Sequence, residues 1–353
     1  MKGQSENLKK MPDTESSNSY PDPLYFRSLK ENKSIQCNLC PNNCIIAPGK
    51  FGICGVRGNS IEGGKGIIPY SGKLSALAVD PIEKKPLYHF FPGSKILSAG
   101  FYGCSFRCPY CQNYSISTRT DASAETVSPE EAVKITEKTG TIGLAYTYSE
   151  PIVHIEWVMK TAFLLKKKKL KNVLVTNGYI NPEAGKALLE NMDALNIDLK
   201  SFNDDFYRSE LKGKLDPVKD FIRLAAAETH IEVTTLVIPG KNDTRQEIED
   251  IARFIASVKK SIPLHLSCYY PSYKYTTEPT SPETVIRLAG EASKYLDYVY
   301  PGNIGMRDSD TKCPSCGAVI ISRSGHALRS VKAEGIDKKK CINCGQKIEI
   351  ITE

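Results

Sequence analysis

The sequence predicts an α/β fold, a partial (βα)6 barrel of the TIM type, flanked by an N-terminal and a C-terminal cysteine-rich module. From about residue 96, short apolar runs alternate with helical stretches at intervals of roughly 30 residues, the length of a βαβ unit. Eleven of the 12 cysteines fall in three tight clusters. The middle cluster directly follows a predicted strand, and functional residues of such barrels gather where the strands end.

The predicted strands are short, apolar and bounded by turn residues, which is typical of strands buried in a parallel sheet. They cover residues 95–101, 142–148, 172–176, 194–199, 231–238, 264–268 and 298–300. Three of the intervening helices share one start signal, in which a capping residue is followed by Pro and Glu. The caps are Ser128, Asn181 and Ser281, and Asp243 or Thr244 can cap a fourth helix that runs through Val258.

Composition divides the chain into four parts. Residues 1–33 are polar and predict a loosely ordered leader. Residues 34–95 carry four cysteines and few apolar stretches, so a bound metal would help this module to fold. Residues 96–302 form the predicted barrel, and residues 303–353 form a tail with paired CxxC motifs and short β-like runs at 318–322 and 347–352.

Charge and hydropathy patterns exclude several classes of protein. No apolar run reaches the roughly 18 residues that a membrane-spanning helix needs. The first twenty residues lack an apolar signal region, so we expect a cytoplasmic protein without a membrane partner. The net charge of +7 lies largely in two lysine runs, 166–169 and 338–340, which solvated surface explains better than nucleic-acid binding. Clustered cysteines in such a chain indicate metal sites in place of disulfides.

The middle cluster is CxxxCxxC, formed by Cys104, Cys108 and Cys111. Three thiolates can hold three corners of a [4Fe–4S] cluster, whereas an electron-transfer cluster takes four cysteines. The remaining iron is then open, and it can bind the amine and carboxylate of S-adenosylmethionine (SAM) and pass it one electron. The alternative is a structural zinc site with a distant fourth ligand. The strand-end position and the aromatic Phe106 favour the cluster.

These residues resemble the radical SAM superfamily, whose hallmark is CxxxCxxC with an aromatic residue before the second cysteine. The chain is most similar to the branch of the pyruvate formate-lyase activating enzyme, and within it to the AmmeMemoRadiSam system radical SAM enzyme family. The matching segments are CNLCPNNCIIAPGKFGICGVR, DPIEKKPLYHFFPGSKILSAG, CSFRCPYCQN, TYSEP, TNGYI, NIDLKSF, TTLVIPGKNDT and CPSCG. Ser105 stands where this family has Asn, and Gln112-Asn113 replaces the His-Asn of a typical glycyl-radical activase.

The resemblance implies a SAM pocket at the ends of the second and third predicted strands. Tyr148, Ser149 and Glu150 occupy the position of the motif that binds the SAM amine, and Glu150 can accept a charge-assisted hydrogen bond from that ammonium. Asn177 follows the third strand and is expected to lie in the same pocket. The TYSEP segment can equally be a helix start, with Ser149 as the cap.

Asp198 and Lys200 lie at the end of the fourth predicted strand. Because they alternate with Leu199, they point to the same side of the strand. The resemblance implies that Asp198 lies toward the ribose of SAM and Lys200 toward its carboxylate. The alternative is a plain ion pair at the barrel rim.

The flanking cysteines predict two further metal sites. The paired CxxC motifs of the tail, each followed by glycine, are typical of a zinc ribbon, with an iron–sulfur or rubredoxin-like iron site as the alternative. The N-terminal set fits either zinc or an auxiliary [4Fe–4S] cluster. The tail ligands are Cys313, Cys316, Cys341 and Cys344, and the N-terminal ligands are Cys37, Cys40, Cys44 and Cys54.

The expected activity is that of an oxidoreductase-type radical SAM enzyme. Reductive cleavage of SAM would give a 5′-deoxyadenosyl radical, which abstracts hydrogen from a substrate that the sequence does not identify. A protein substrate, as in an activase, and a small molecule are both open. The expected partner is a one-electron reductant such as ferredoxin or flavodoxin. The alternative from another class is a non-catalytic metal-binding adaptor for RNA or protein.

Overall fold

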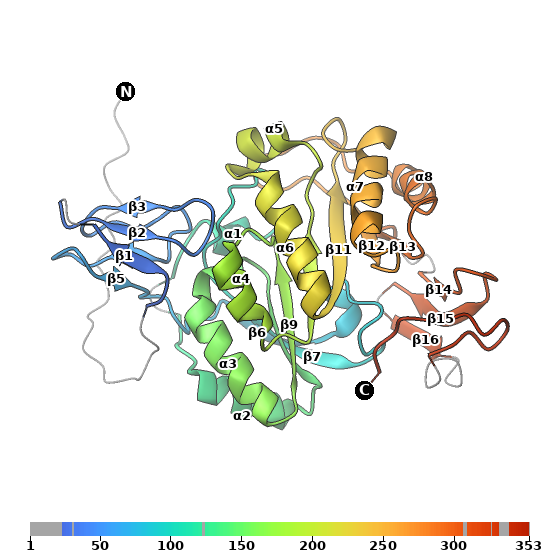
Figure 1. Ribbon diagram of the computed structural model, residues 1–353, viewed down its shortest axis with the longest axis horizontal. Helices are drawn as coiled ribbons and strands as arrows, with labels where there is room; N and C mark the ends of the chain where they lie inside the picture. The colour runs from blue at the N-terminus through green and yellow to red at the C-terminus, as the bar shows by residue number, and fades with distance from the viewer. Residues whose placement is uncertain are drawn as a thin grey trace.

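The computed structural model describes residues 23–29, 32–121, 124–305, 309–325, 327–331 and 339–352. Its centre is an eight-stranded sheet in the order β13-β12-β11-β10-β9-β8-β7-β6 (Figure 1). Seven strands run parallel, and β6 (Ala76–Pro81) pairs antiparallel with β7 at one edge. Within the described residues no pairing joins β6 to β13, so the sheet is an open, partial barrel.

Six strand–helix units build the parallel part, which confirms the predicted α/β class and (βα)6 order. The strands differ from the predicted ranges by one or two residues at most ends, where side-chain pattern alone is least informative. The strands are β7 (Lys95–Gly100), β8 (Gly143–Thr147), β9 (Lys171–Thr176), β10 (Ala194–Asp198), β11 (His230–Val237), β12 (Leu264–Cys268) and β13 (Val299–Gly302). The helices that follow β7 to β12 are α2 (Pro129–Thr139), α3 (Ile155–Lys167), α4 (Pro182–Leu189), α6 (Leu215–Glu228), α7 (Arg245–Val258) and α8 (Pro282–Ala292).

The helix starts follow the capping chemistry in the sequence. Ser128 and Glu131 form a reciprocal capping box at α2, and the Ser281 and Thr244 side chains cap α8 and α7. Asn181 precedes α4 without a side-chain cap bond, and its Nδ2 donates to the carbonyl oxygen of Asn38, 2.7 Å away. Shorter elements are α1 (Tyr114–Ser117), α5 (Asp204–Phe206), η1 (Ile82–Lys84), η2 (Pro151–His154) and η3 (Tyr207–Leu211).

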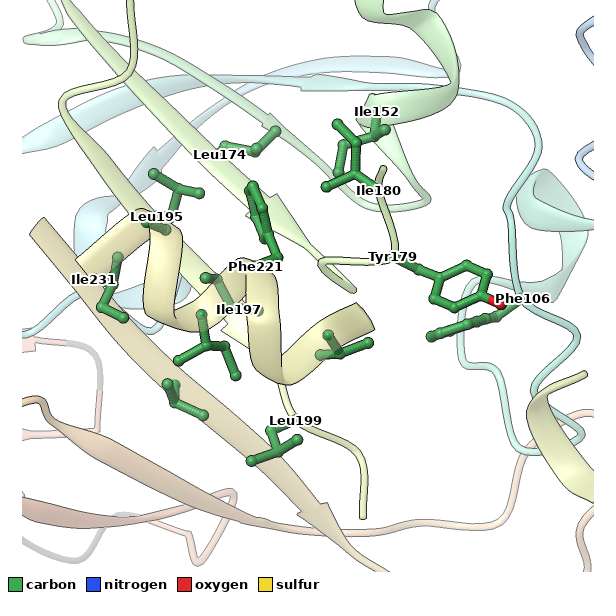
Figure 2. Close-up of a cluster of buried hydrophobic side chains, with 14 of the residues drawn as sticks. Phe106, Ile152, Leu174, Tyr179, Ile180, Leu195, Ile197, Leu199, Phe221 and Ile231 are labelled. Atoms are coloured by element: carbon green, nitrogen blue, oxygen red, sulfur yellow. The ribbon is translucent and has the colours of Figure 1, made fainter. Parts of the chain in front are cut away.

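The two faces of the sheet differ in polarity and in what they contact. On the outer face, aliphatic side chains of the strands pack against the helices; Figure 2 shows Leu195 and Ile197 of β10 around Phe221 of α6. On the inner face, polar residues at alternate positions, among them Asn196 and Asp198, line a cavity. Burial of the outer face stabilises the barrel, and the inner face is left available for ligands.

The N-terminal module consists of two small antiparallel sheets beside the barrel. The first joins β1 (Phe26–Ser28), β2 (Ile35–Cys37) and β3 (Ile45–Ile46), and the second joins β4 (Gly58–Asn59) and β5 (Gly66–Ile67). The buried Arg57 guanidinium pairs in bidentate fashion with Glu156 of α3, at 2.8 and 2.9 Å. This pair anchors the module to the barrel.

The structure divides the chain differently from the predicted boundaries at two places. β1 lies in the segment expected to be a loosely ordered leader, of which residues 1–22, 30 and 31 lie outside the described part. β6 lies within the predicted N-terminal module but belongs to the central sheet through six residue pairs with β7. An antiparallel edge strand has no helical crossover before it, so the strand–helix alternation gave no signal for it.

The C-terminal module covers one end of the barrel. It contains β14 (Thr311–Lys312), β15 (Val319–Ser324) and β16 (Ala327–Val331). The run predicted at 347–352 is not a strand but makes single bridges, one of them between Ile351 and Phe90. The buried Arg323 donates to the carbonyl oxygen of Tyr88 at 2.6 Å, which fastens the module to the segment between β6 and β7. No helix in the described ranges is long and apolar enough to cross a membrane.

Candidate active site

The CxxxCxxC loop follows β7 at the carboxyl edge of the sheet. The Arg107 guanidinium holds the loop in shape by donating to the carbonyl oxygens of Cys104 and Phe106, both at 2.9 Å. The backbone amide of Phe106 points at the Cys104 Sγ, 3.4 Å away, and the Ser117 hydroxyl lies 3.4 Å from the Cys111 Sγ. A backbone N–H is therefore directed at the Cys104 sulfur, and a hydroxyl lies beside the Cys111 sulfur.

Asn177 joins the end of β9 to this loop. Its Nδ2 lies 3.7 Å from the Cys104 Sγ and donates to the Ser105 hydroxyl at 3.1 Å. Its Oδ1 accepts from the backbone amide of Tyr179 at 2.9 Å, which fixes the rotation of the amide group. Ser105, the residue that departs from the family pattern, is thus a hydrogen-bond partner of Asn177.

Glu150 is almost completely buried at the end of β8, with 1% of its surface exposed. One carboxylate oxygen accepts from the Thr176 hydroxyl at 2.7 Å, and the other accepts from the Asn177 amide at 2.8 Å. Burial raises the pKa of Glu150 to about 7, although these hydrogen bonds act in the opposite direction. Protein donors occupy both oxygens, so Glu150 fixes the strand ends that carry Asn177.

Asp198 and Lys200 form an ion pair of 2.9 Å on the cavity wall. Burial alone would lower the pKa of Lys200, but the negative charges of Asp198 and of the Cys108 thiolate raise it well above its usual value. Both residues point the same way, as their alternation predicted, and lie beside the cysteine loop. The pair is compatible with either of the two roles that the sequence left open.

Tyr148 and Ser149 make contacts that the sequence pattern did not predict. Tyr148 has a positive φ of 72°, and its hydroxyl donates to Asp80 at 2.7 Å. The Lys85 ammonium lies 4.6 Å from the centre of the Tyr148 ring and donates to the same Asp80 carboxylate at 2.8 Å. The Ser149 hydroxyl donates to the carbonyl oxygen of Phe101 at 2.8 Å, and Glu150, not Ser149, caps the η2 helix that follows.

These residues surround a cavity of about 1180 Å³ inside the barrel. At its carboxyl-edge end lie the three cysteines of the loop, together with Glu150, Asn177 and the Asp198–Lys200 pair. At the other end lie Tyr88 and His265, whose Nε2 is 2.6 Å from the buried Glu232 carboxylate. The cavity is therefore deep enough to hold a cofactor near the cysteines and a second ligand beyond it.

Sequence reasoning missed the residues at the far end of the cavity. The sequence does not single out His265, because none of its five histidines has a spacing typical of metal ligands or of a nucleophile's partner. Asp80 and Lys85 lie in the DPIEKKPLYHF segment, which carries part of the family resemblance but no recognisable chemistry. Their proximity to Tyr148 depends on the antiparallel β6–β7 pairing, so no local pattern could reveal it.

The cysteine loop fits an iron–sulfur cluster by its donor set. Burial raises the pKa of Cys104 well above its usual value and that of Cys108 to about 11, so bare thiolates are unfavourable there. Bound iron compensates for this cost by coordinating the thiolates. The N–H groups at the sulfurs and the open cavity in front of them suit a cluster that has one iron free for a further ligand.

The tail cysteines close into a much tighter group. The four ligand sulfurs of this set all lie within 4.8 Å of one another, with 3.6 Å between Cys313 and Cys344 and between Cys316 and Cys341. Hydrogen bonds from the backbone amides of Cys344 and Asn343 lower the pKa of Cys341 to about 6. Zn–S bonds of about 2.3 Å in a tetrahedron require sulfurs at this separation. The group can bind a metal ion as four thiolates.

The comparisons with known proteins agree with this geometry. The model of the radical SAM superfamily matches residues 100–255, the segment that carries the cysteine loop, Glu150, Asn177 and the Asp198–Lys200 pair. The protein MJ0808 of Methanocaldococcus jannaschii is 37% identical over 337 residues, which cover 94% of this chain and 99% of that protein. This chain belongs to the radical SAM superfamily. Membership implies a [4Fe–4S] cluster and SAM as cofactors, and it supports SAM-cleaving radical chemistry.

Two further similarities are more distant. A putative glycyl-radical enzyme activating enzyme of M. jannaschii is 26% identical over 213 residues, which cover 56% of this chain and 85% of that protein. A solved domain of the pyruvate-formate lyase-activating enzyme from Bacteroides vulgatus superposes with a TM-score of 0.41 and 20% identity, and covers 46% of this chain and 99% of that domain.

Proposed function

We propose that this protein reductively cleaves SAM at a [4Fe–4S] cluster held by Cys104, Cys108 and Cys111, and that the resulting radical abstracts hydrogen from a substrate in the barrel cavity. The observation that carries the proposal is that the three thiols line a cavity of about 1180 Å³ together with Glu150, Asn177 and the Asp198–Lys200 pair. When bound, the cluster and SAM supply one electron and a 5′-deoxyadenosyl radical. The protein supplies orientation and a water-poor environment.

The polar residues around the cavity have different roles in this proposal. The Asp198–Lys200 pair offers a carboxylate and an ammonium to the polar groups of SAM. Glu150 holds the Asn177 amide and the Thr176 hydroxyl, and so positions the strand ends under the cofactor. Tyr148 closes one side of the cavity through Asp80, and Ser149 ties its own segment to Phe101. We therefore assign Glu150 and Ser149 as positioning residues.

The proposal is tested with anaerobically purified protein. Under dithionite, we expect formation of 5′-deoxyadenosine, and its loss when Cys104, Cys108 or Cys111 is replaced by Ala. Circular dichroism should show that the fold largely survives, because the barrel core lies on the outer face of the sheet. Cys268→Ala is the matched control, since Cys268 is buried in that core. A single cysteine variant with near wild-type activity would remove that residue from the cluster.

The class of substrate stays a prediction. An activase-like role on a protein follows from the family resemblance, and the 26% identical putative glycyl-radical enzyme activating enzyme supports it. The adaptor alternative predicts a colourless zinc protein that leaves SAM intact. Incubation with SAM, reductant and a candidate glycyl-radical enzyme distinguishes the roles, because an activase generates a glycyl-radical EPR signal in its partner.

A further inference from the structure

The four N-terminal cysteines come from the end of β2, the β2–β3 connection and the loop between β3 and β4. Pairing of β2 with β3 brings Cys37 beside Cys44, with 2.9 Å between the Cys37 nitrogen and the Cys44 oxygen. The amide of Ile53 points at the Cys44 Sγ from 3.5 Å, which brings the loop of Cys54 to the same place. A Cβ on Gly52 would lie 3.3 Å from that sulfur, so the close approach favours glycine.

Their surroundings are those of a ligand set. All four side chains are free thiols. Backbone amides donate to the sulfurs of Cys40 and Cys54 as well as Cys44. Four free thiols in adjoining segments, with N–H groups directed at their sulfurs, form a donor set that suits a metal centre.

The spacing of these thiols differs from that of the tail cysteines. In the described part of the chain, which includes every cysteine, only the tail set has three or more ligand atoms all within 4.8 Å of one another. In the N-terminal set, no three sulfurs all lie within 4.8 Å of one another. The same is true of the CxxxCxxC loop. The thiolates around a [4Fe–4S] cluster are farther apart than those around one zinc ion, because each binds a different iron.

The N-terminal site lies against the CxxxCxxC loop. The Asn42 amide donates to the carbonyl oxygen of Ser105 at 3.0 Å. A Cβ on Gly103, whose φ is +79°, would lie 2.5 Å from the carbonyl oxygen of Cys54, so only glycine fits between the two cysteine segments. The backbone of Cys54 is thus in contact with the residue that precedes Cys104.

The segment that follows β9 contacts both the CxxxCxxC loop and the N-terminal module. Figure 2 shows Phe106 of the loop beside Tyr179, and their ring centres are 4.7 Å apart. Tyr179 is almost completely buried, with 1% of its surface exposed. Asn181, two residues on, donates its backbone amide to Leu39 at 3.0 Å.

We propose that Cys37, Cys40, Cys44 and Cys54 hold an auxiliary [4Fe–4S] cluster next to the catalytic cluster. Four cysteine ligands leave no open iron, so this cluster carries electrons and does not bind SAM. It would take one electron from a ferredoxin- or flavodoxin-type protein and pass that electron to the catalytic cluster, returning to its oxidised state. The relay role rests on the proposed function, whereas the presence of the cluster does not.

Metal content and spectroscopy of the whole chain test the cluster. The variant Cys104→Ser/Cys108→Ser/Cys111→Ser, purified anaerobically, should retain about four iron and four sulfide per chain and give a cluster EPR signal on reduction. The wild type and the matched control Cys268→Ser should hold about eight of each. In the reduced wild type, the EPR spectrum should be broadened relative to the sum of the two single-cluster variants, because the clusters are close.

A second pair of measurements tests the relay. The variant Cys40→Ser/Cys44→Ser should lose about four iron. It should cleave SAM at near wild-type rate with dithionite, but at least tenfold more slowly with reduced flavodoxin. The relay would be overturned if SAM cleavage by this variant were slowed equally with both reductants, or if it were not slowed with flavodoxin. A colourless triple variant with two zinc ions per chain would overturn the cluster. Absence of SAM cleavage in a wild type that holds both clusters would refute only the proposed function.

Discussion

The side-chain amide of Asn177 is oriented toward the sulfur of Cys104, with 3.7 Å between Nδ2 and Sγ. The amide cannot rotate away, because its oxygen accepts from the Tyr179 backbone amide and its residue is held by Glu150. Hydrogen bonds to cluster sulfurs stabilise the more negative, reduced state of an iron–sulfur cluster. We therefore expect the end of β9 to raise the reduction potential of a cluster bound by this loop.

Replacing Asn177 with Ala should lower the reduction potential of the catalytic cluster. A hydrogen bond worth about 1 kcal/mol corresponds to roughly 40 mV for a one-electron couple. An EPR-monitored redox titration measures the shift. Ser105→Ala, which removes a partner of Asn177 but not the amide itself, is the control and should shift the potential less. An unchanged potential in Asn177→Ala, with full iron content, would contradict the prediction.

Glu150 should make SAM-free protein less stable as the pH rises. Its folded pKa of about 7 lies above the unfolded value near 4.5, so the folded state binds the extra proton between these limits. The free energy of unfolding should therefore fall through pH 4.5–7, by on the order of 3 kcal/mol, and stay level above. Denaturant titrations at pH 5 and 8 measure this. Glu150→Gln should remove this component, and an identical pH profile in that variant would count against a buried carboxyl that titrates near neutrality.

Asp198 and Lys200 should set the affinity for SAM. Loss of a charge-assisted hydrogen bond costs about 1.5–3 kcal/mol, or roughly ten- to hundredfold in Kd. Isothermal titration of SAM into Lys200→Ala and Asp198→Ala, with iron content measured alongside, gives the result. The variant Lys219→Ala, which loses an exposed ion pair on α6, is the control. Unchanged affinity in both variants at full iron content would leave the pair as a rim ion pair.

The tail should bind one zinc ion that stabilises the chain without taking part in SAM cleavage. Cys316→Ser removes one sulfur of the tight group and should abolish zinc binding and lower Tm. SAM cleavage at low temperature should persist, because the tail lies at the far end of the cavity. Elemental analysis and thermal unfolding provide the readouts. Iron with labile sulfide in the tail, and no zinc, would overturn the assignment.

The sequence predicted the barrel well, because its signals are local. Proline-led helix starts such as that of Ser128, and short apolar strands, are legible within a few residues. The three cysteine sets were visible for the same reason. The contact of Asn42 with Ser105 joins residues 63 positions apart, and that of Tyr148 with Asp80 joins residues 68 apart. Such relationships depend on the assembled fold, so the sequence could indicate neither the network behind Tyr148 nor the proximity of the two cysteine sites.

The segment between β6 and β7 also bears on how the protein folds. The amides of Tyr88 and His89 donate to Glu232, which is 144 and 143 residues away, and Arg323 reaches Tyr88 across 235 residues. Contacts of such long sequence separation cost the most chain entropy and form slowly. We therefore expect the end of the cavity opposite the cysteine loop to close last, when the C-terminal module packs against this segment. The strand–helix units that carry the cysteine loop depend on shorter-range contacts and can assemble before that step.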